Sequence, residues 1–311
     1  MKRYYLLFLF CIAALICCDQ KTTPTPEPVD HDVHDSCLTI GLLPTLDCLP
    51  FQVAKDEHLF DSLGLSVTFR YFASQMDAEL ALIQNEVSMC ASDLFRIVVM
   101  QSQKQPVRYL FSTHREWNII SNKKLRISRI QQLGDRIVGI SRNSTEDYIC
   151  DQVVSILGNK KQILRPQIND LLLRQEMMEK HQIDVALLPH PLALLSTIKG
   201  NDMLPLLNVD DEGFCGFALS LQSGLNEEDT KRLFTSYNLA VERLLSRPRL
   251  QLSNAAIAAF HLQKITDSIR PKEHFQKASI PTVERINTAS KWLSGKQLLP
   301  TTFSTDTLLL H

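Results

Sequence analysis

A strand–helix–strand pattern near the start of the chain constrains the fold more than any other feature of the sequence. Residues 38–43 form a short apolar run of the kind found in buried strands, and the apolar positions that follow Phe51 have helical spacing. Residues 65–69 then alternate between apolar and polar side chains, which is typical of a second strand. Strands joined through one helix are normally parallel, with a right-handed crossover. A ligand meets such a unit just beyond the carboxyl end of its first strand, at Thr45 and Asp47.

The same alternation continues along the chain and places more polar residues after predicted strands. Strands predicted at residues 87–91 and 107–111 are followed by Ser92, Asp93 and Thr113. The carboxyl ends of parallel strands meet at one edge of a sheet. We therefore expect these side chains to line one cleft.

A set of polar residues at such turns forms the candidate ligand-binding site. The candidates are Thr45, Asp47, Ser74, Ser92, Asp93, Thr113, Ser141, Arg142, Asn143, Ser144 and His190. Several of them also have a purely structural explanation, because serine before a helix caps it and an acidic side chain in a loop is often simply solvated. The sequence leaves both explanations open for Ser74, Ser92, Ser144, Asp47 and Asp93.

The turn at residues 141–144 indicates which chemical group a ligand carries. It precedes a predicted helix, whose free N–H groups and dipole favour an anion, and Arg142 adds a planar charged donor. Alternatively, Glu146 in the first helical turn already compensates the dipole. On the opposite side of the cleft, Asp47 and Asp93 suit an amine. The sequence therefore predicts a small polar or zwitterionic ligand.

The first residues are organised like a bacterial lipoprotein signal. Lys2 contributes positive charge, and residues 4–17 are apolar without interruption, which is shorter than the ~20 residues that a membrane-spanning helix needs. We predict a signal peptide at residues 1–17, lipidation of Cys18 within a sequence that resembles a lipobox, and a disordered tether at residues 18–37. The mature protein would be lipid-anchored in the cell envelope, on the periplasmic side of the membrane. An uncleaved signal anchor is the alternative.

Charge and cysteine content argue against several other classes of protein. The 33 basic and 34 acidic residues leave a net charge of -1, so nothing favours nucleic acid as a partner. When Cys11, Cys17 and Cys18 are set aside, five of the eight cysteines remain, without a Cys-x-x-Cys pair or zinc-binding spacing. His31 and His34 lie among acidic residues, but in a segment without fixed geometry. With no catalytic motif either, the sequence predicts no metal site, no cofactor and no enzymatic activity.

Two regions of the sequence resemble one family. The phrases IGLLPTLD, LPFQVAKDEHLF and GLSV, within residues 40–67, are similar to the amino-terminal motif of type II periplasmic solute-binding proteins. The most similar branch serves transporters of sulfonates, nitrate and thiamine-pyrimidine precursors. The phrase DVALLPHP at residues 184–191 is similar to a second family motif, in which Glu is frequent at the position of His190. Gly is usual in the family where this chain has His58. The resemblance extends over about residues 38–300.

This resemblance implies an α/β fold of two lobes, in which mainly parallel sheets are flanked by helices and a ligand cleft lies between the lobes. Lobe 1 would comprise residues 38–115 and 213–311, and lobe 2 would comprise residues 116–212. The chain would cross between the lobes near residues 113–117 and again near 213–221. These two crossovers would act as the hinge.

The resemblance also implies a function, that of a substrate-binding lipoprotein of an ABC import system. Such a protein is a monomer that captures a small solute and delivers it to a membrane permease. One alternative is an enzyme on the same scaffold, of the thiamine-pyrimidine or menaquinone pathway type. A ligand-sensing receptor domain that signals to a membrane partner is another. The predicted signal peptide argues against the enzymes, because those pathways are cytoplasmic.

Overall fold

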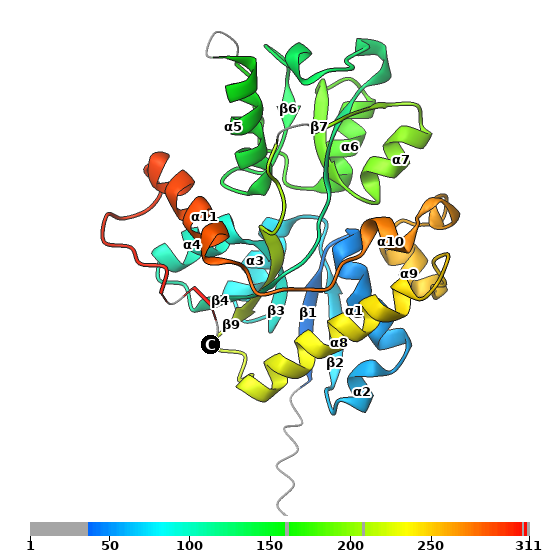
Figure 1. Ribbon diagram of the computed structural model, residues 1–311, viewed down its shortest axis with the longest axis vertical. Helices are drawn as coiled ribbons and strands as arrows, with labels where there is room; N and C mark the ends of the chain where they lie inside the picture. The colour runs from blue at the N-terminus through cyan, green and yellow to red at the C-terminus, as the bar shows by residue number, and fades with distance from the viewer. Residues whose placement is uncertain (1–36, 159–161, 207–208, 307, 310–311) are drawn as a thin grey trace, which may run out of the picture. The chain divides into compact units, whose positions relative to one another are not determined.

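Two β-sheets, each with its own flanking helices, form the part of the chain that the computed structural model describes (Figure 1). That part comprises residues 37–158, 162–206, 209–306 and 308–309. The predicted signal peptide, the lipidation site Cys18 and the tether up to residue 36 lie outside the described residues and stay predictions.

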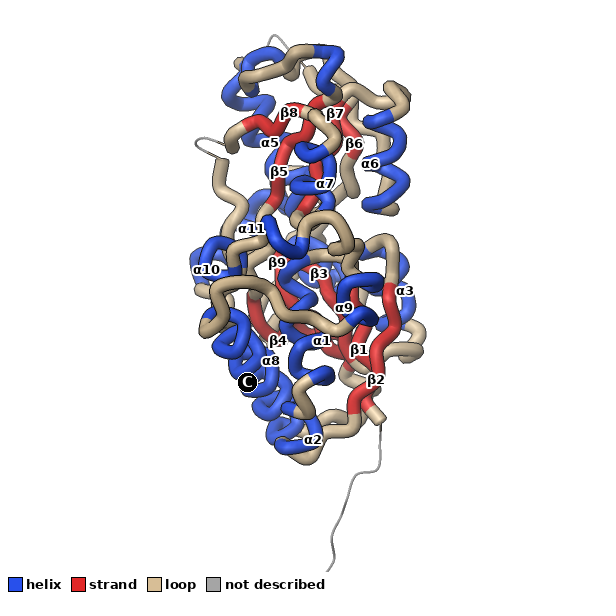
Figure 2. The backbone as a smooth tube through the Cα atoms, turned by 90° about the vertical axis from the view of Figure 1, so that its right-hand side faces the viewer, coloured by secondary structure: helices blue, strands red, loops and turns tan. Residues whose placement is uncertain are grey.

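The first sheet contains the strand–helix–strand unit that the sequence predicts. Its strands are β1 (Leu38–Leu42), β2 (Val67–Tyr71), β3 (Met89–Asp93), β4 (Val107–Ser112) and β9 (Cys215–Ser220), in the spatial order β2-β1-β3-β9-β4. Strand β1 pairs in parallel with both β2 and β3, as expected, and Figure 2 shows these strands beside one another. Strand β9 lies between β3 and β4 and is antiparallel to both.

The second sheet is smaller and is also mixed. Its strands are β5 (Trp117–Ser121), β6 (Val138–Gly139), β7 (Val185–Pro189) and β8 (Asp202–Leu204), in the order β6-β7-β5-β8. Strands β6 and β7 are parallel, whereas β5 is antiparallel to β7 and β8. Parallel pairing, which the sequence predicts as the main arrangement, is therefore confined to pairs without β5 or β9. These two strands adjoin the crossovers between the sheets, so they run against their neighbours.

Helices flank both sheets. The helices beside the first sheet are α1 (Leu49–Asp56), α2 (Leu59–Ser62), α3 (Gln75–Ile83), α4 (Leu94–Ser102), α8 (Glu227–Leu245), α9 (Asn254–Ala259), α10 (Pro271–His274) and α11 (Val283–Gly295). The helices beside the second sheet are α5 (Thr145–Leu157), α6 (Leu171–Glu179) and α7 (Leu192–Ile198). Ser74, Asp93 and Asn226 each accept a hydrogen bond from the N–H three residues on, which caps α3, α4 and α8. Within the described ranges, no helix has the length and apolar character required to cross a membrane.

Each sheet has a hydrophobic core of its own, and we call each sheet with its helices and core lobe 1 and lobe 2. In lobe 1, the Phe51 ring packs with ring centroids 4.9 Å from Phe217 and 5.2 Å from Tyr237. The core of lobe 2 is aliphatic for the most part and includes Ile119 and Leu187. The lobe boundaries expected at residues 115/116 and 212/213 remain a proposal.

The five cysteines of the described part are free thiols, and all except Cys37 are buried. Burial raises the pKa of Cys48, Cys150 and Cys215 to about 12. These thiols are therefore protonated and unreactive at neutral pH.

Candidate functional site

A buried ion pair lies beyond the carboxyl ends of β1 and β4. Asp47 belongs to a short 3-10 turn, Leu46–Cys48, that follows β1, and Arg115 follows β4. The Asp47 carboxylate accepts hydrogen bonds from Arg115 Nε and Nη2 at 3.0–3.2 Å and from Thr113 Oγ1 at 2.9 Å. Both charged side chains are at most 2% exposed. The forked contact satisfies both charges, which makes their burial tolerable.

Gln75 connects this ion pair to a second group of buried polar side chains. Its amide oxygen accepts from Arg115 Nη1 at 3.1 Å, and its amide nitrogen donates to Asp93 Oδ2 at 2.8 Å and to Glu79 Oε1 at 3.0 Å. Ser92 Oγ also donates to Glu79 Oε1, at 2.8 Å. Burial, together with the nearby Glu79 carboxylate, raises the pKa of Asp93. Four candidates (Asp47, Ser92, Asp93 and Thr113) thus belong to one hydrogen-bonded network.

The Asp93 carboxylate carries this network across to lobe 2. Its Oδ1 accepts from the N–H of Arg96 at 3.0 Å, and its Oδ2 accepts from the N–H of Thr145, the first residue of α5, at 3.3 Å. A helix amino-terminus favours a carboxylate through its unpaired N–H groups and its dipole. The anion that the sequence predicts at this helix start is therefore supplied by the protein itself.

The turn at residues 141–144 is arranged around Glu146 and not around Arg142. The Glu146 carboxylate accepts from the N–H of Ser141 at 2.6 Å and from Arg174 Nη1 at 2.6 Å. Arg174 is fully buried and also donates to Ser141 Oγ at 3.0 Å. The Arg142 side chain is exposed, outside these contacts. The structure thus agrees with the alternative explanation of this turn, in which the Glu146 carboxylate, and not a ligand, accepts the hydrogen bond from the N–H of Ser141.

Four other candidates are bonded to their own neighbours in the sequence. The N–H of Asn143 donates to the carboxylate four residues on at 3.1 Å, and Ser144 Oγ donates to the carbonyl three residues back at 2.8 Å. Thr45 Oγ1 donates to the thiol three residues on, and Ser74 Oγ accepts from the N–H three residues on. For Ser74, helix capping accounts for the contact.

His190 follows β7 and lies in a separate cluster with Glu116 and His274. Glu116 Oε2 is 2.9 Å from His274 Nδ1 and 3.6 Å from His190 Nε2, and the two imidazole rings meet edge to face with centroids 4.9 Å apart. Burial opposes ionisation of Glu116, but the two histidines lower its pKa well below the ordinary range. Two imidazoles and a carboxylate are ligand types that hold transition metals.

A small cavity separates this cluster from the buried ion pair. It measures about 10 Å³ and is lined by Leu46, Asp47, His114, Arg115, Glu116, His190 and His274. That volume corresponds to about one water molecule or one ion.

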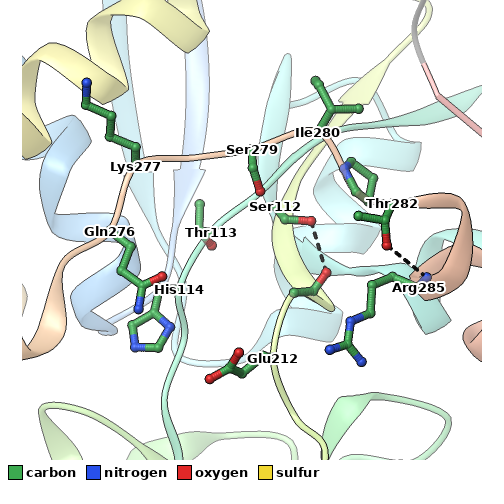
Figure 3. A pocket seen from close by; sticks show the side chains of 12 residues that line it. Ser112, Thr113, His114, Glu212, Gln276, Lys277, Ser279, Ile280, Thr282 and Arg285 are labelled. Atoms are coloured by element: carbon green, nitrogen blue, oxygen red, sulfur yellow. Dashed lines mark hydrogen bonds between the residues drawn. The ribbon is translucent and has the colours of Figure 1, made fainter.

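A larger cavity, of about 230 Å³, lies beside the two crossovers (Figure 3). It is lined by Ser112, Thr113, His114, Glu212, Gly213, Gln276, Lys277, Ser279, Ile280, Pro281, Thr282 and Arg285. Ser112 Oγ donates to the carbonyl of Gly213 at 3.0 Å, so one crossover is fastened to the other. The backbone of Ser112 also exchanges hydrogen bonds with that of Ser279. These bonds hold the two crossovers and the segment at residues 276–282 together.

Sequence reasoning did not identify Arg115, Gln75, Arg174, Glu116 or His274. Arg115 and Glu116 had a usable signal, since both follow the same predicted strand as Thr113. Gln75 and Arg174 lie within helices, and no spacing in the sequence indicates their partners.

No family model and no curated protein matches the chain, but solved structures do. One is the alkanesulfonate-binding protein SsuA of Xanthomonas axonopodis pv. citri bound to MOPS (15% identity, 86% of this chain and 95% of that chain covered, TM-score 0.65). Another is the ligand-binding component of an ABC-type import system of Staphylococcus aureus with zinc bound (12% identity, 88% of this chain and 96% of that chain covered, TM-score 0.71). A third is the periplasmic nitrate-binding protein NrtA of Synechocystis PCC 6803 (12% identity, 88% of this chain and 84% of that chain covered, TM-score 0.65).

Likeness at such low identity shows the fold alone. The chain has the two-lobed α/β fold of periplasmic binding proteins, which confirms the fold class that the sequence predicts.

Proposed function

We propose that this chain is the solute-binding lipoprotein of an ABC import system, which holds a small polar solute between its lobes and delivers it to a membrane permease. The observation that carries the proposal is the buried network of Asp47, Arg115, Gln75 and Asp93, which ends on the amino-terminus of α5 in the opposite lobe. Structural neighbours described as alkanesulfonate- and nitrate-binding proteins support the same role. The protein acts as a monomer without enzymatic activity, anchored through Cys18 on the periplasmic side of the membrane.

The network indicates how a solute would bind. When the lobes open, the contact between Asp93 and Thr145 breaks, which exposes the start of α5 together with the edge of Arg115. An acidic group of the solute would take the place of Asp93 at the helix start and receive a hydrogen bond from Arg115. Exchange of one carboxylate for another acidic group keeps these donors bonded. An amine on the same solute would face Asp47 or Asp93.

A thermal-shift screen tests the proposal with sulfonates, nitrate, thiamine-pyrimidine precursors and amino acids. A ligand at 100 times its Kd adds about 2.7 kcal/mol to the free energy of unfolding, which gives a clear rise in Tm. If no compound raises the Tm, and native mass spectrometry of the protein from its own cells finds no bound small molecule, the proposal is wrong.

Two arginine variants then test the site with a compound from that screen. Arg115→Lys keeps the positive charge but loses the planar guanidinium and its paired N–H donors. Because a hydrogen bond to a charged group contributes ~1.5–3 kcal/mol, the Kd should rise about tenfold or more. Arg142→Ala serves as the control, since this exposed side chain lies outside the network, and its Kd should change less than about twofold. Equal affinities of wild type and a folded Arg115→Lys variant would exclude Arg115 from the site.

Lipid anchoring needs a separate measurement. Mass spectrometry of the mature amino-terminus should find a lipid-modified Cys18. An unmodified amino-terminus at another residue would contradict the anchor.

A further inference from the structure

We propose that Glu116, His190 and His274 bind one divalent transition-metal ion of the class that imidazole ligands favour, such as Zn²⁺. The inference goes beyond the proposed function, because solute binding does not require it. It also revises the prediction from sequence that the chain has no metal site.

The ligand atoms lie close to the spacing that metal ligands have. One ligand atom from each residue lies within 4.8 Å of the other two. Glu116 Oε2 is 2.9 Å from His274 Nδ1 and 3.6 Å from His190 Nε2. Ligands that bind zinc at about 2.0–2.2 Å lie roughly 3–3.5 Å from one another. Small side-chain shifts would therefore suffice to bind an ion.

The His190 ring is buried without a strong hydrogen bond. Its side chain is 5% exposed, and its Nδ1 is a buried atom with no hydrogen-bond partner. Its Nε2 makes only long contacts, at 3.4 Å to Asn118 Nδ2 and 3.6 Å to Glu116. A buried polar atom without a partner costs free energy, so such groups are rare in proteins. Because neither ring nitrogen is held by a strong protein contact, the ring is available to bind a metal ion through Nε2, the atom that lies 3.6 Å from Glu116 Oε2.

The surroundings suit a single cation. The cavity that Glu116, His190 and His274 line has a volume of about 10 Å³, which is room for an ion but not for an organic solute. Arg115 lines the same cavity, yet its charge is neutralised by the forked contact with Asp47. With neutral imidazoles, the remaining charge around the cavity is that of the Glu116 carboxylate. Three protein ligands leave a coordination position for water or for a solute group.

The three ligands come from different parts of the molecule. Glu116 lies in the first crossover, His190 follows β7 of lobe 2, and His274 ends α10 of lobe 1. The N–H of Leu46 in lobe 1 also donates to the carbonyl of His190 at 3.0 Å. A bound ion would therefore link the lobes in the arrangement that the structure shows.

The test uses the full-length protein in detergent, stripped with EDTA and then dialysed. Titration with Co²⁺ should produce the visible absorption of cobalt bound by nitrogen and oxygen ligands, and calorimetry with Zn²⁺ should give one site per chain. Zn²⁺ should also reduce the radius of gyration measured by small-angle scattering, because the ion links the lobes.

The variants decide which residues bind the ion. His274→Ala and His190→Ala should each weaken Zn²⁺ binding at least about 100-fold, since loss of a ligand exceeds the 10–100-fold effect of its supporting residues. His274 is the safer position, because it is only partly buried, so it decides the question if His190→Ala does not fold. His181→Ala, an exposed histidine elsewhere in lobe 2, should leave binding unchanged. The pair His31→Ala/His34→Ala controls for the amino-terminal histidines.

Unchanged Zn²⁺ affinity in folded His274→Ala would overturn the proposal, as would binding that disappears only in His31→Ala/His34→Ala. Either result would leave the proposed function standing, because solute binding is measured separately, by repeating the thermal-shift screen in EDTA. Conversely, a metal site confirmed by these variants would not depend on any solute.

Discussion

At the scale of single residues, the buried pair of Asp47 and Arg115 should behave as a unit. Asp47→Asn leaves a guanidinium 2% exposed without its carboxylate, so we expect a loss of about 3–5 kcal/mol in the free energy of unfolding. Asp47→Asn/Arg115→Met removes both charges and fills the space with an apolar chain, and it should be less destabilised than Asp47→Asn. Urea unfolding of the two variants measures this. A double variant that is as unstable as Asp47→Asn, or less stable, would show that the unpaired charge is not the main cost.

Asp211, in the second crossover, gives a prediction about pH. Burial raises the pKa of this carboxyl to about 6, and the neighbouring Glu212 and Asp210 add to the effect. Because the folded state binds this proton more tightly than the unfolded state, the contribution of Asp211 to stability is complete below about pH 4. That contribution is lost as the pH rises through about 6.

Asp211→Asn removes this dependence. At pH 7.5 the variant should be more stable than wild type by about 1–2 kcal/mol, less than the full shift implies because solvent screens a partly exposed group. At pH 4 the difference should nearly vanish. Urea unfolding at both pH values measures it, and a difference that is the same at both would contradict the raised pKa.

At the scale of elements, the antiparallel strand β9 depends on a glycine. A Cβ on Gly216 would lie 2.0 Å from the carbonyl oxygen of Phe111 and 2.4 Å from the hydroxyl of Tyr109. The register between β4 and β9 also shifts at this point, between Tyr109 and Phe111. Gly216→Ala should therefore force the strands apart and cost about 3 kcal/mol or more.

Gly295→Ala is the matched control for that substitution. Gly295 is the last residue of α11, and a Cβ there would meet no atom within 4 Å. Since alanine favours helix over glycine, this variant should be as stable as wild type or up to about 1 kcal/mol more stable. Thermal unfolding compares the two. Equal stability of both variants would mean that β4 and β9 accommodate a Cβ at Gly216 without cost.

At the scale of the whole molecule, α11 of lobe 1 is fastened to α5 of lobe 2. Lys296 Nζ lies 2.9 Å from Asp147 Oδ2 and 3.1 Å from Asp151 Oδ2, and Trp292 Nε1 donates to Asp151 Oδ2 at 2.9 Å. Burial by itself would raise the pKa of Asp151, but Arg165 and Lys296 outweigh this effect and lower it. The Asp151 carboxylate thus stays charged and available to Lys296.

Lys296→Met keeps an apolar side chain at this position, but it removes both ion pairs and the cation–π contact in which Lys296 Nζ lies 4.1 Å from the centroid of the Trp292 ring. Partly exposed pairs contribute at most about 1 kcal/mol each, enough to shift an equilibrium between open and closed lobes. We expect a larger radius of gyration than that of wild type in small-angle scattering without ligand. Lys180→Met, which removes an exposed ion pair with Glu176 at the end of α6, should scatter like wild type. Identical profiles for Lys296→Met and wild type would show that this contact does not govern closure.

The sequence by itself determined the local features of this protein. Helix starts such as Ser74, Asp93 and Asn226 were predictable, because a cap and the apolar spacing behind it lie within a few residues of each other. The first strand–helix–strand unit and the family phrases indicated the fold for the same reason. Thr45, Asp47 and Thr113 after strand ends could also be chosen, because parallel strands place their carboxyl ends together, whereas Ser92 and Asp93, which the sequence predicts after a strand, are the last two residues of β3.

Only the tertiary structure decided which side chains meet. Arg115 pairs with Asp47, and His274 approaches Glu116, across long stretches of sequence that carry no pattern linking them. Arg142, which the sequence predicts as a donor to an anionic group, is exposed. Asp93 instead binds the start of α5 from the other lobe. Periodicity and capping follow from backbone geometry over one or two turns. The partner of a buried charge depends on how the two lobes are packed together.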